Sequence, residues 1–258
     1  MHTWHWQTWN HLPYLTCSLL EPWKHGFFTQ QFAPRSPFEI TKALYPFAQT
    51  YRAKQVHGNI VLAPSEMPNP LTNENLPDAD GVISEQASQA VWVCSADCTP
   101  VLIADVETGQ VSAVHAGWRG TAQKIVPNAI ARLCQQGSQI QDLRVAMGPA
   151  IAGEVYQVST QVAVEVGATV IKLDLESPLD ASVERLLALS DSPVLSDSTA
   201  GRVRLDVRRV NALQLEQLGL GAEQIAIAPH CTYQDSLNFF SYRREKLKKA
   251  QWSGIVST

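Results

Sequence analysis

The sequence predicts a mixed α/β sandwich that forms one domain across residues 1–258. A chain of 258 residues can bury a core of its own without disulfides, at the upper end of the single-domain range. Its β-rich runs and helix-like segments are interspersed without the strict strand and helix alternation of a doubly wound sheet. No segment repeats with a period of about 20 to 50 residues, which excludes a solenoid.

The first elements predicted along the chain are short. Strands are expected at Leu12–Leu20 and in the "GFFT" run around Phe27, and a helix capped by Ser36 begins at Pro37. A further strand, "YRAKQV", runs directly into His57. The stretch 63–78 is rich in Pro, Asn and Glu and has no clear period, so it predicts a surface loop that could cover a site.

The middle of the chain predicts the centre of the sandwich. Four β-rich runs are separated by turn residues and are expected to form buried central strands: "GVIS", "AVWVCS", "PVLIADV" and "VSAVHAGW". A segment with helical spacing then follows Gly120 and stops at Gly137. Pro127 interrupts this segment, so we expect a helix that is kinked or that starts late at Pro127.

The C-terminal half predicts two more strand and helix pairs. "LRVAMGPAI" is expected to be a strand that enters a turn, and "STQVAVEVGA" a helix capped by Ser159 or Thr160. Residues 174–201 are acidic and rich in Ser and Leu, and we interpret them as a variable insertion with a short helix around Val183–Leu189. A strand then becomes an amphipathic helix after Asp206 and ends near Gly219 or Gly221. "QIAIAPHCTY" and "FFSY" are expected to be late strands.

The charge balance and the hydropathy of the chain argue against two kinds of partner. Lys and Arg number 20 against 24 Asp and Glu, which gives a formal net charge of -4. No global positive field attracts a phosphate backbone, so we expect no nucleic-acid partner. The chain is 45% hydrophobic and has no apolar run long enough to span a bilayer, so we expect no membrane partner either. A monomer or a small homo-oligomer is expected.

The N-terminus and the cysteines indicate the cytoplasm. Residues Met1–Trp9 lack the basic segment and the uninterrupted apolar run of a signal peptide. The 5 cysteines are an odd number at irregular spacing, which suits reduced thiols. His2 and His5 are expected to lie in a docked or frayed terminus rather than to bind a metal.

Three residues share a local character that suits a metal site. His57, Cys98 and His115 each end a strand-like run at a small or turn-forming residue, where side chains can point into a common crevice. Zinc binds imidazole nitrogen and thiolate sulfur, and three protein ligands would leave a fourth position for water or substrate. The spacing is no known metal signature, however, and hydrogen-bonded loop histidines with a small buried thiol explain the pattern at least as well.

A cysteine nucleophile is the second chemical interpretation of the same residues. Cys98 would attack, His115 would act as its base, and Asp97 or Asp80 would orient the imidazole. A single Cys with a His elsewhere in the sequence is a loose signal, and the residues alone do not separate this hydrolase chemistry from metal binding.

Three further residues are candidates for substrate binding. Arg119 follows Trp118 and precedes a helix-like segment, where a guanidinium can bind phosphate or carboxylate. Arg52 is a weaker candidate of the same type, and Asp80 could accept a hydrogen bond from a ribose hydroxyl or an exocyclic amine, or simply form a turn. The basic run "YRREKLKK" around Arg243 is expected to be a solvated helix or strand end. His230 and Cys231 have no clear role.

Several motifs together carry a family resemblance. "KQVHGN", "DADGVIS", "CSADCTPVLIAD", "AVHAGWRGT", "GPAI", "YQV", "LDVRRVNALQLEQLG" and "FFSYRRE" occur in this order over most of the chain. In these motifs the sequence resembles the YfiH-like family, whose members carry the names laccase-domain, polyphenol-oxidase-like or purine nucleoside phosphorylase proteins. Two departures are Ala150, where the family has Cys, and "QQFAPRSP", where it has a glycine-rich segment.

The resemblance implies a fold, a metal and an activity. It implies a four-layer αββα sandwich and a zinc site whose ligands are His57, Cys98 and His115. It also implies phosphorolysis of adenosine, inosine and methylthioadenosine, together with adenosine deaminase activity. The partners would then be a nucleoside and phosphate, with Arg119, helped by Arg52, holding the phosphate. Deamination would instead use a hydroxide bound to zinc.

Two other functions stay open at this point. The family's older name implies a copper-dependent polyphenol oxidase, but a laccase needs several copper ions and one His-Cys-His set supplies too few ligands. A partner-binding protein that keeps the fold without metal or turnover is the alternative outside enzymology.

Overall fold

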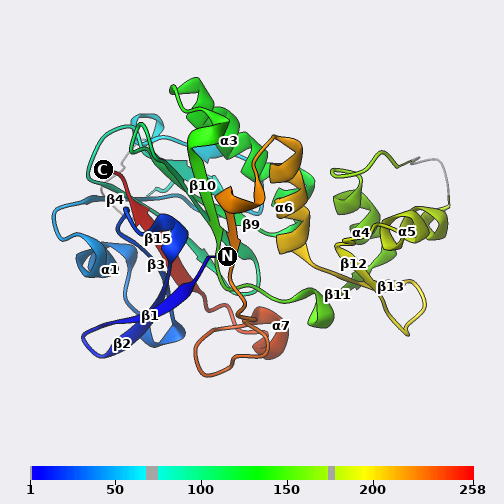
Figure 1. Cartoon of the computed structure of the whole chain (residues 1–258). Coiled ribbons are helices and arrows are strands. Elements are labelled where there is room, and N and C mark those ends of the chain that lie inside the picture. The colour runs from blue at the N-terminus through cyan, green and yellow to red at the C-terminus, as the bar shows by residue number, and fades with distance from the viewer. Residues whose placement is uncertain (1, 68–74, 174–177) are drawn as a thin grey trace.

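The computed structural model describes residues 2–67, 75–173 and 178–258, and Figure 1 shows how its elements are arranged. Two six-stranded sheets form the main body. The strands of the first sheet lie in the order β1 (Trp4–Trp9), β2 (Leu12–Cys17), β3 (His25–Phe28), β15 (Gln251–Val256), β7 (Gln89–Ser95) and β4 (Gln49–Arg52). Only the β4 and β7 pair of this sheet is parallel.

The second sheet contains three of the four central strands that the sequence predicts, whereas the run "AVWVCS" forms β7 of the first sheet. Its order is β14 (Ile225–Ile227), β10 (Leu143–Met147), β8 (Thr99–Asp105), β9 (Val111–Ala116), β6 (Gly81–Ile83) and β5 (Val61–Leu62). β8 and β9 are buried along their whole length, as expected for strands covered on both faces. The pairs at the two ends of the sheet are parallel and the inner pairs are antiparallel.

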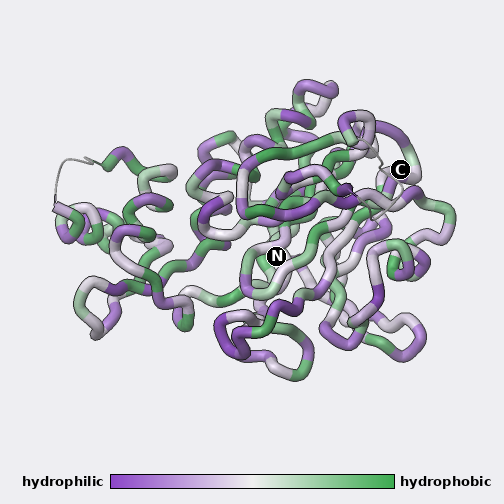
Figure 2. Tube along the Cα trace, turned by 180° about the vertical axis from the view of Figure 1, so that it is seen from behind, coloured by the Kyte–Doolittle hydropathy of each residue, from purple (hydrophilic) through white to green (hydrophobic). Residues whose placement is uncertain are grey.

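The two sheets pack face to face and helices cover both outer faces, so the four-layer sandwich is confirmed. The core between the sheets includes Phe27 and Val93 from the first sheet and Leu102 and Ala113 from the second. α3 (Ile125–Gln135) and α6 (Val207–Gln217) cover the outer face of the second sheet. α1 (Pro37–Leu44) packs on the outer face of the first sheet around Trp92, whose indole N–H donates to the Thr41 hydroxyl at 3.0 Å. Figure 2 shows hydrophobic and hydrophilic residues alternating along the outer helices.

A smaller unit lies beside α6, at the right of Figure 1, and has an apolar cluster of its own. It combines a three-stranded sheet with three helices: β11 (Gln157–Ser159), β13 (Arg202–Leu205), β12 (Val194–Ser196), α2 (Trp118–Ala122), α4 (Thr160–Gly167) and α5 (Leu179–Leu187). The predicted insertion contributes α5 and β12 to this unit, and its helix starts four residues earlier than expected. Residues 174–177 lie outside the described part, and the interpretation as a variable insertion stays a prediction.

Several helix starts follow the predicted capping chemistry. The Ser36 backbone N–H and hydroxyl both donate to Glu39 at the start of α1. The Ser159 hydroxyl accepts from the Val162 amide at the start of α4, and Asp206 accepts from two amides of α6. These side chains replace the missing intrahelical acceptors of the first turn.

Three predictions about elements were wrong. The strand that starts at Gln49 ends at Arg52, because the chain turns before His57, whose φ is +62°. The helix break lies at Lys124, with a φ of +58°, and Pro127 is tolerated because it sits in the first turn of α3. "FFSY" is not a strand; it leads into α7 (Tyr242–Glu245). The N-terminus, which was expected to be docked or frayed, is docked, because β1 pairs with β2 over six residues.

Short 3-10 helices complete the fold; they cover Ser18–Leu20, Gln30–Phe32, Pro64–Glu66, Ile140–Asp142, Gly153–Val155 and Ala222–Gln224. The described ends of the predicted 63–78 loop are partly buried, and Glu66 pairs there with Arg132 of α3 at 2.6 Å. Residues 68–74 of that loop lie outside the described part. Among the described residues, no helix has the length and apolar character needed to cross a membrane.

Candidate functional site

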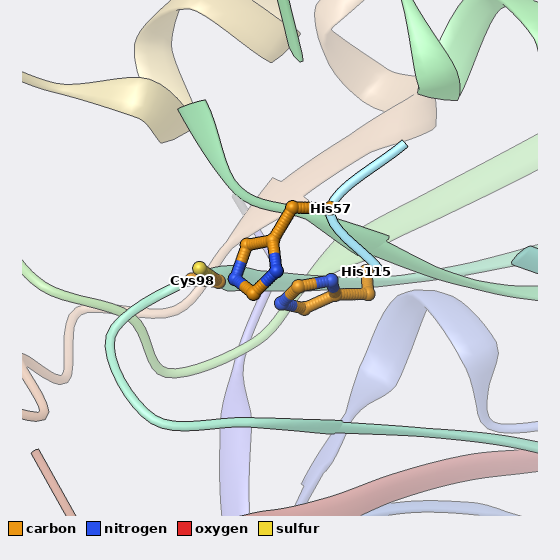
Figure 3. Close-up of side chains that lie close together, drawn as sticks. All are labelled: His57, Cys98 and His115. Carbon is orange, nitrogen blue, oxygen red and sulfur yellow. The ribbon is translucent and has the colours of Figure 1, made fainter. Parts of the chain in front are cut away.

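Three separate segments bring His57, Cys98 and His115 together, as Figure 3 shows. His57 lies in the turn after β4, Cys98 in the turn between β7 and β8, and His115 on β9. One possible ligand atom from each residue lies within 4.8 Å of the other two. Among the described residues this is the one cluster of at least three His, Cys, Asp or Glu side chains with such spacing.

Asp80 holds both histidine segments in place. Its side chain is completely buried, and one carboxylate oxygen accepts from His115 Nδ1 at 2.8 Å and from the His57 amide at 3.0 Å. The other oxygen accepts from the amides of Gly58 at 2.7 Å and Val56 at 3.1 Å. A carboxylate only accepts, so His115 Nδ1 carries the proton and its Nε2 is left to face the cluster. This carboxylate–histidine arrangement is typical of metal sites.

Asp97 does not orient the His115 imidazole, the role considered for it from the sequence. Its carboxylate accepts from the Thr232 hydroxyl at 2.8 Å and from the Arg243 amide at 2.7 Å. Its own φ of +87° shapes the turn that presents Cys98. Asp97 therefore connects the Cys98 turn to the C-terminal segment, and it does not orient His115.

Cys98 and His115 form a mutually stabilised ion pair in the metal-free protein. Burial alone would raise the pKa of Cys98, but the charge of His115 and hydrogen bonds from both histidines lower it to about 6. Burial would lower the pKa of His115, yet the Cys98 thiolate and the Asp80 carboxylate raise it to about 9. A thiolate is thus available near neutral pH, and the thiolate form of cysteine is the one that binds metals.

The cluster fits a single zinc ion. Zinc takes thiolate sulfur at about 2.3 Å and imidazole nitrogen at about 2.0 to 2.1 Å, so its ligand atoms lie about 3 to 4 Å apart. The observed spacing of these atoms, within 4.8 Å of one another, is close to that range. Gly117 keeps this space free, because a Cβ there would lie 2.8 Å from Cys98 Sγ and 3.3 Å from His57 Cδ2.

The cluster lies in the wall of a pocket of about 570 Å³. The pocket combines cationic and aromatic side chains, and its lining includes Gln55, Trp118, Arg119, Tyr156, Tyr242, Arg243, Lys246, Lys248 and Lys249. Arg119 stacks on the Trp118 ring at 4.5 Å from its centroid, and Arg243 stacks on the Tyr156 ring at 4.6 Å. The structure thus brings the predicted Arg119 to the same pocket as the three candidate ligands.

Other predicted site residues lie outside this lining. Asp80 is enclosed behind His115, so its geometry supports positioning rather than contact with a substrate. Arg52 packs over the Trp252 ring at 5.2 Å, and burial lowers its pKa against the opposing influence of Cys94. The His230 ring packs 5.3 Å from that of Trp6, away from the pocket.

Neither departure from the family pattern reaches the pocket lining. Ala150 is buried and forms a β-bridge with Cys231, whose Sγ accepts from the Ala152 amide at 3.3 Å. The segment that follows β3 borders a separate cavity of about 90 Å³ next to Ala250.

Sequence reasoning missed several residues of the pocket, Tyr156 and Arg243 among them. Tyr156 lies in the "YQV" motif, and burial raises its pKa to about 12, with the Cys98 charge acting in the same direction. Arg243 belongs to the basic run that was expected to be solvated. The dense run of positive charge was the available signal, but only the fold shows that it faces the Cys98 turn.

The fold and the site define a class of protein: a four-layer sandwich with a His-Cys-His cluster that could hold a metal ion, in the wall of a basic pocket. Residues 39–256 match the family described as "Multi-copper polyphenol oxidoreductase laccase", and the chain belongs to this laccase-like, YfiH-type family.

Comparisons with individual proteins agree with this assignment. A protein of Synechocystis sp. named purine nucleoside phosphorylase is 51% identical over 256 residues, covering 98% of this chain and 97% of that protein. A protein of an unknown prokaryotic organism named adenosine deaminase RL5 is 28% identical over 169 residues, covering 66% of this chain and 58% of that protein. The crystal structure of YlmD from Geobacillus stearothermophilus is similar with a TM-score of 0.79 at 23% identity, covering 98% of both chains, and shows the shared fold.

Proposed function

We propose that this protein is a zinc-dependent purine nucleoside phosphorylase that acts on adenosine, inosine and methylthioadenosine. The observation that carries the proposal is the His57, Cys98 and His115 cluster in the wall of a pocket rich in cationic side chains. The names of its relatives point to nucleosides, and the pocket offers cations for phosphate and aromatic faces for a planar base. The reduced thiols and this substrate class favour action in the cytoplasm.

The proposed reaction makes one bond and breaks one bond at the ribose. A phosphate oxygen bonds to the anomeric carbon while the bond from that carbon to the purine nitrogen breaks, giving ribose 1-phosphate and the free base after protonation. Arg119 would hold the phosphate with charge-assisted hydrogen bonds. Placing both reactants in one pocket removes most of the entropic barrier to their encounter. Arg52 could assist Arg119 in binding the phosphate only if its side chain turned away from the Trp252 ring.

The metal would be held by His57, Cys98 and His115, with Asp80 fixing the two histidine segments. When bound, zinc supplies a Lewis acid and lowers the pKa of a bound water to about 7. The same chemistry would support a second activity, the hydrolytic deamination of adenosine, for which one relative is named.

Two alternatives make different predictions. A copper polyphenol oxidase requires several copper ions, whereas the described residues provide one cluster of three ligands. A Cys-His hydrolase is favoured by the lowered pKa of Cys98 beside His115. That enzyme would keep its activity after removal of the metal, and a zinc phosphorylase would lose it.

Metal analysis combined with a nucleoside assay tests the proposal. Purified wild-type protein is expected to contain about one zinc per chain and to release hypoxanthine from inosine only when phosphate is present. Cys98→Ala should lose both the metal and the activity, while Cys134→Ala on α3 should keep both. Full retention of metal by Cys98→Ala would exclude Cys98 as a ligand, and release without phosphate would show hydrolysis.

A further inference from the structure

The C-terminal segment Tyr242–Lys249 forms a positively charged wall of the pocket. Arg243, Lys246, Lys248 and Lys249 all contribute to the lining, and Arg119 adds a further cation from α2. The chain as a whole carries a formal charge of -4, so this concentration of positive charge is a local feature. Such a wall attracts an anionic group.

These cations make no salt bridge to a described residue. Within the described residues, none of the lining cations of this wall lies within 4.0 Å of a carboxylate oxygen. Asp97 is the acidic residue of the pocket lining, and its carboxylate already accepts from Thr232 and the Arg243 amide. Arg244, which follows Arg243 in the chain, differs from these cations because its guanidinium forms a salt bridge with Glu245 at 2.7 Å.

Arg243 is held in a fixed position at this wall. Its backbone amide donates to Asp97, and one terminal nitrogen donates to the Gln157 carbonyl at 2.9 Å. The guanidinium also stacks on the Tyr156 ring. The other N–H groups of the guanidinium make no hydrogen bond to a described residue, which leaves donors for a ligand. Because Asp97 precedes Cys98 directly, its carboxylate links the Arg243 backbone to the turn that carries the candidate metal ligand.

We propose that Arg243, together with Lys246, Lys248 and Lys249, forms a binding subsite for a phosphate group. Arg243 provides a fixed, directional contact, and the lysines provide charge on flexible stems. The inference rests on the proposed function and deepens it by assigning the phosphate to the C-terminal wall, where Arg119 assists. The phosphate group could be inorganic phosphate or a 5′-phosphate carried by the nucleoside.

Binding and kinetics of two variants test the subsite. In Arg243→Gln, the calorimetric Kd for inorganic phosphate and the KM for phosphate should each rise about tenfold or more, as expected for losing a charge-assisted contact. The KM for inosine should change less than about twofold, because the nucleoside does not use this contact. Lys246→Gln combined with Lys248→Gln should show a smaller change in the same direction. Lys42→Gln on exposed α1 is the charge-matched control and should behave as wild type.

The possible outcomes separate the subsite from the function. An unchanged Kd and KM for phosphate in a folded, metal-loaded Arg243→Gln protein would overturn the subsite. If wild-type protein has no phosphorolytic activity, but binds phosphate in a manner that depends on Arg243, the proposed function fails and the subsite stands. A third outcome concerns inosine 5′-monophosphate. If it binds more tightly than inosine and more tightly than inorganic phosphate, and Arg243→Gln removes this difference, the nucleoside is the source of the phosphate group.

Discussion

At the scale of single residues, one carboxylate organises the site. Asp80 contacts the His115 ring and the three amides of the His57 turn, so two of the three candidate ligands depend on the same side chain. The sequence placed Asp80 among the substrate-binding candidates, because an acidic residue in a turn looks the same whether it faces a ligand or the backbone. Only its complete burial distinguishes the two.

Replacing Asp80 should weaken the metal site without removing a ligand. In Asp80→Asn, the amide cannot accept all four hydrogen bonds, because one oxygen is replaced by a donor group. The zinc affinity is expected to fall about 10- to 100-fold, as is usual when the partner of a metal-bound histidine is lost. Competition with a chromogenic chelator measures this affinity. Asp78→Asn, two residues earlier at an exposed ion pair, is the control, and an equal loss there would contradict the positioning role.

The two pocket cysteines should differ in their reaction with alkylating agents. Interactions with His115 and His57 outweigh burial and lower the pKa of Cys98 to about 6, whereas burial raises the pKa of Cys94 to about 11. In metal-free protein, Cys98 should therefore react with iodoacetamide at pH 7, and its rate should fall as the pH drops through about 6 and the thiolate becomes protonated. Cys94 should stay unmodified over this range. Peptide mass spectrometry assigns the modified residue, and preferential labelling of Cys94 would refute the expected order.

At the scale of elements, capping residues and hydrophobic runs predicted most of the fold. The four central strands and the starts of α1, α4 and α6 followed from local chemistry. β15 was not predicted, although it is a central strand of the first sheet, because it lies at the very end of the chain behind a run of lysines. Its place between β3 and β7 depends on pairing with distant strands, which leaves no local pattern.

The N-terminal cap of α6, Asp206, allows a test of how much side-chain capping stabilises a helix of this fold. Asp206→Ala should lower the free energy of unfolding by about 1 to 2 kcal/mol, because the amides of Arg208 and Arg209 lose their acceptor. Urea denaturation followed by circular dichroism measures the change. Asp191→Ala removes an exposed partner of Arg209 and should change stability by less than about 0.5 kcal/mol. Equal effects of the two substitutions would show that α6 does not depend on this cap.

At the scale of the whole molecule, the candidate site depends on long-range packing. The three candidate ligands come from three separate segments, and their sequence spacing predicted no metal signature. Only the resemblance to the family indicated that His57, Cys98 and His115 bind one metal. In the structure, the packing of the sandwich brings the turns that carry His57 and Cys98 next to β9, which carries His115. Arg243 shows the limit of local reasoning, since a solvated basic run and a pocket wall have the same sequence pattern.

If one metal ion links the three distant segments, removing it should lower the thermal stability of the protein. An ion that binds only the folded state stabilises it by about 2.7 kcal/mol when free metal is 100 times the Kd. For a chain of this size, that corresponds to a rise in Tm of about 5 to 10 °C. Differential scanning calorimetry of chelator-treated wild-type protein, with and without added zinc, should show this rise. Cys98→Ala should show little or none of it, while Cys134→Ala should match the wild type. A zinc-dependent rise of the same size in Cys98→Ala would mean that the stabilising ion binds elsewhere, and the three segments would then be held together by packing alone.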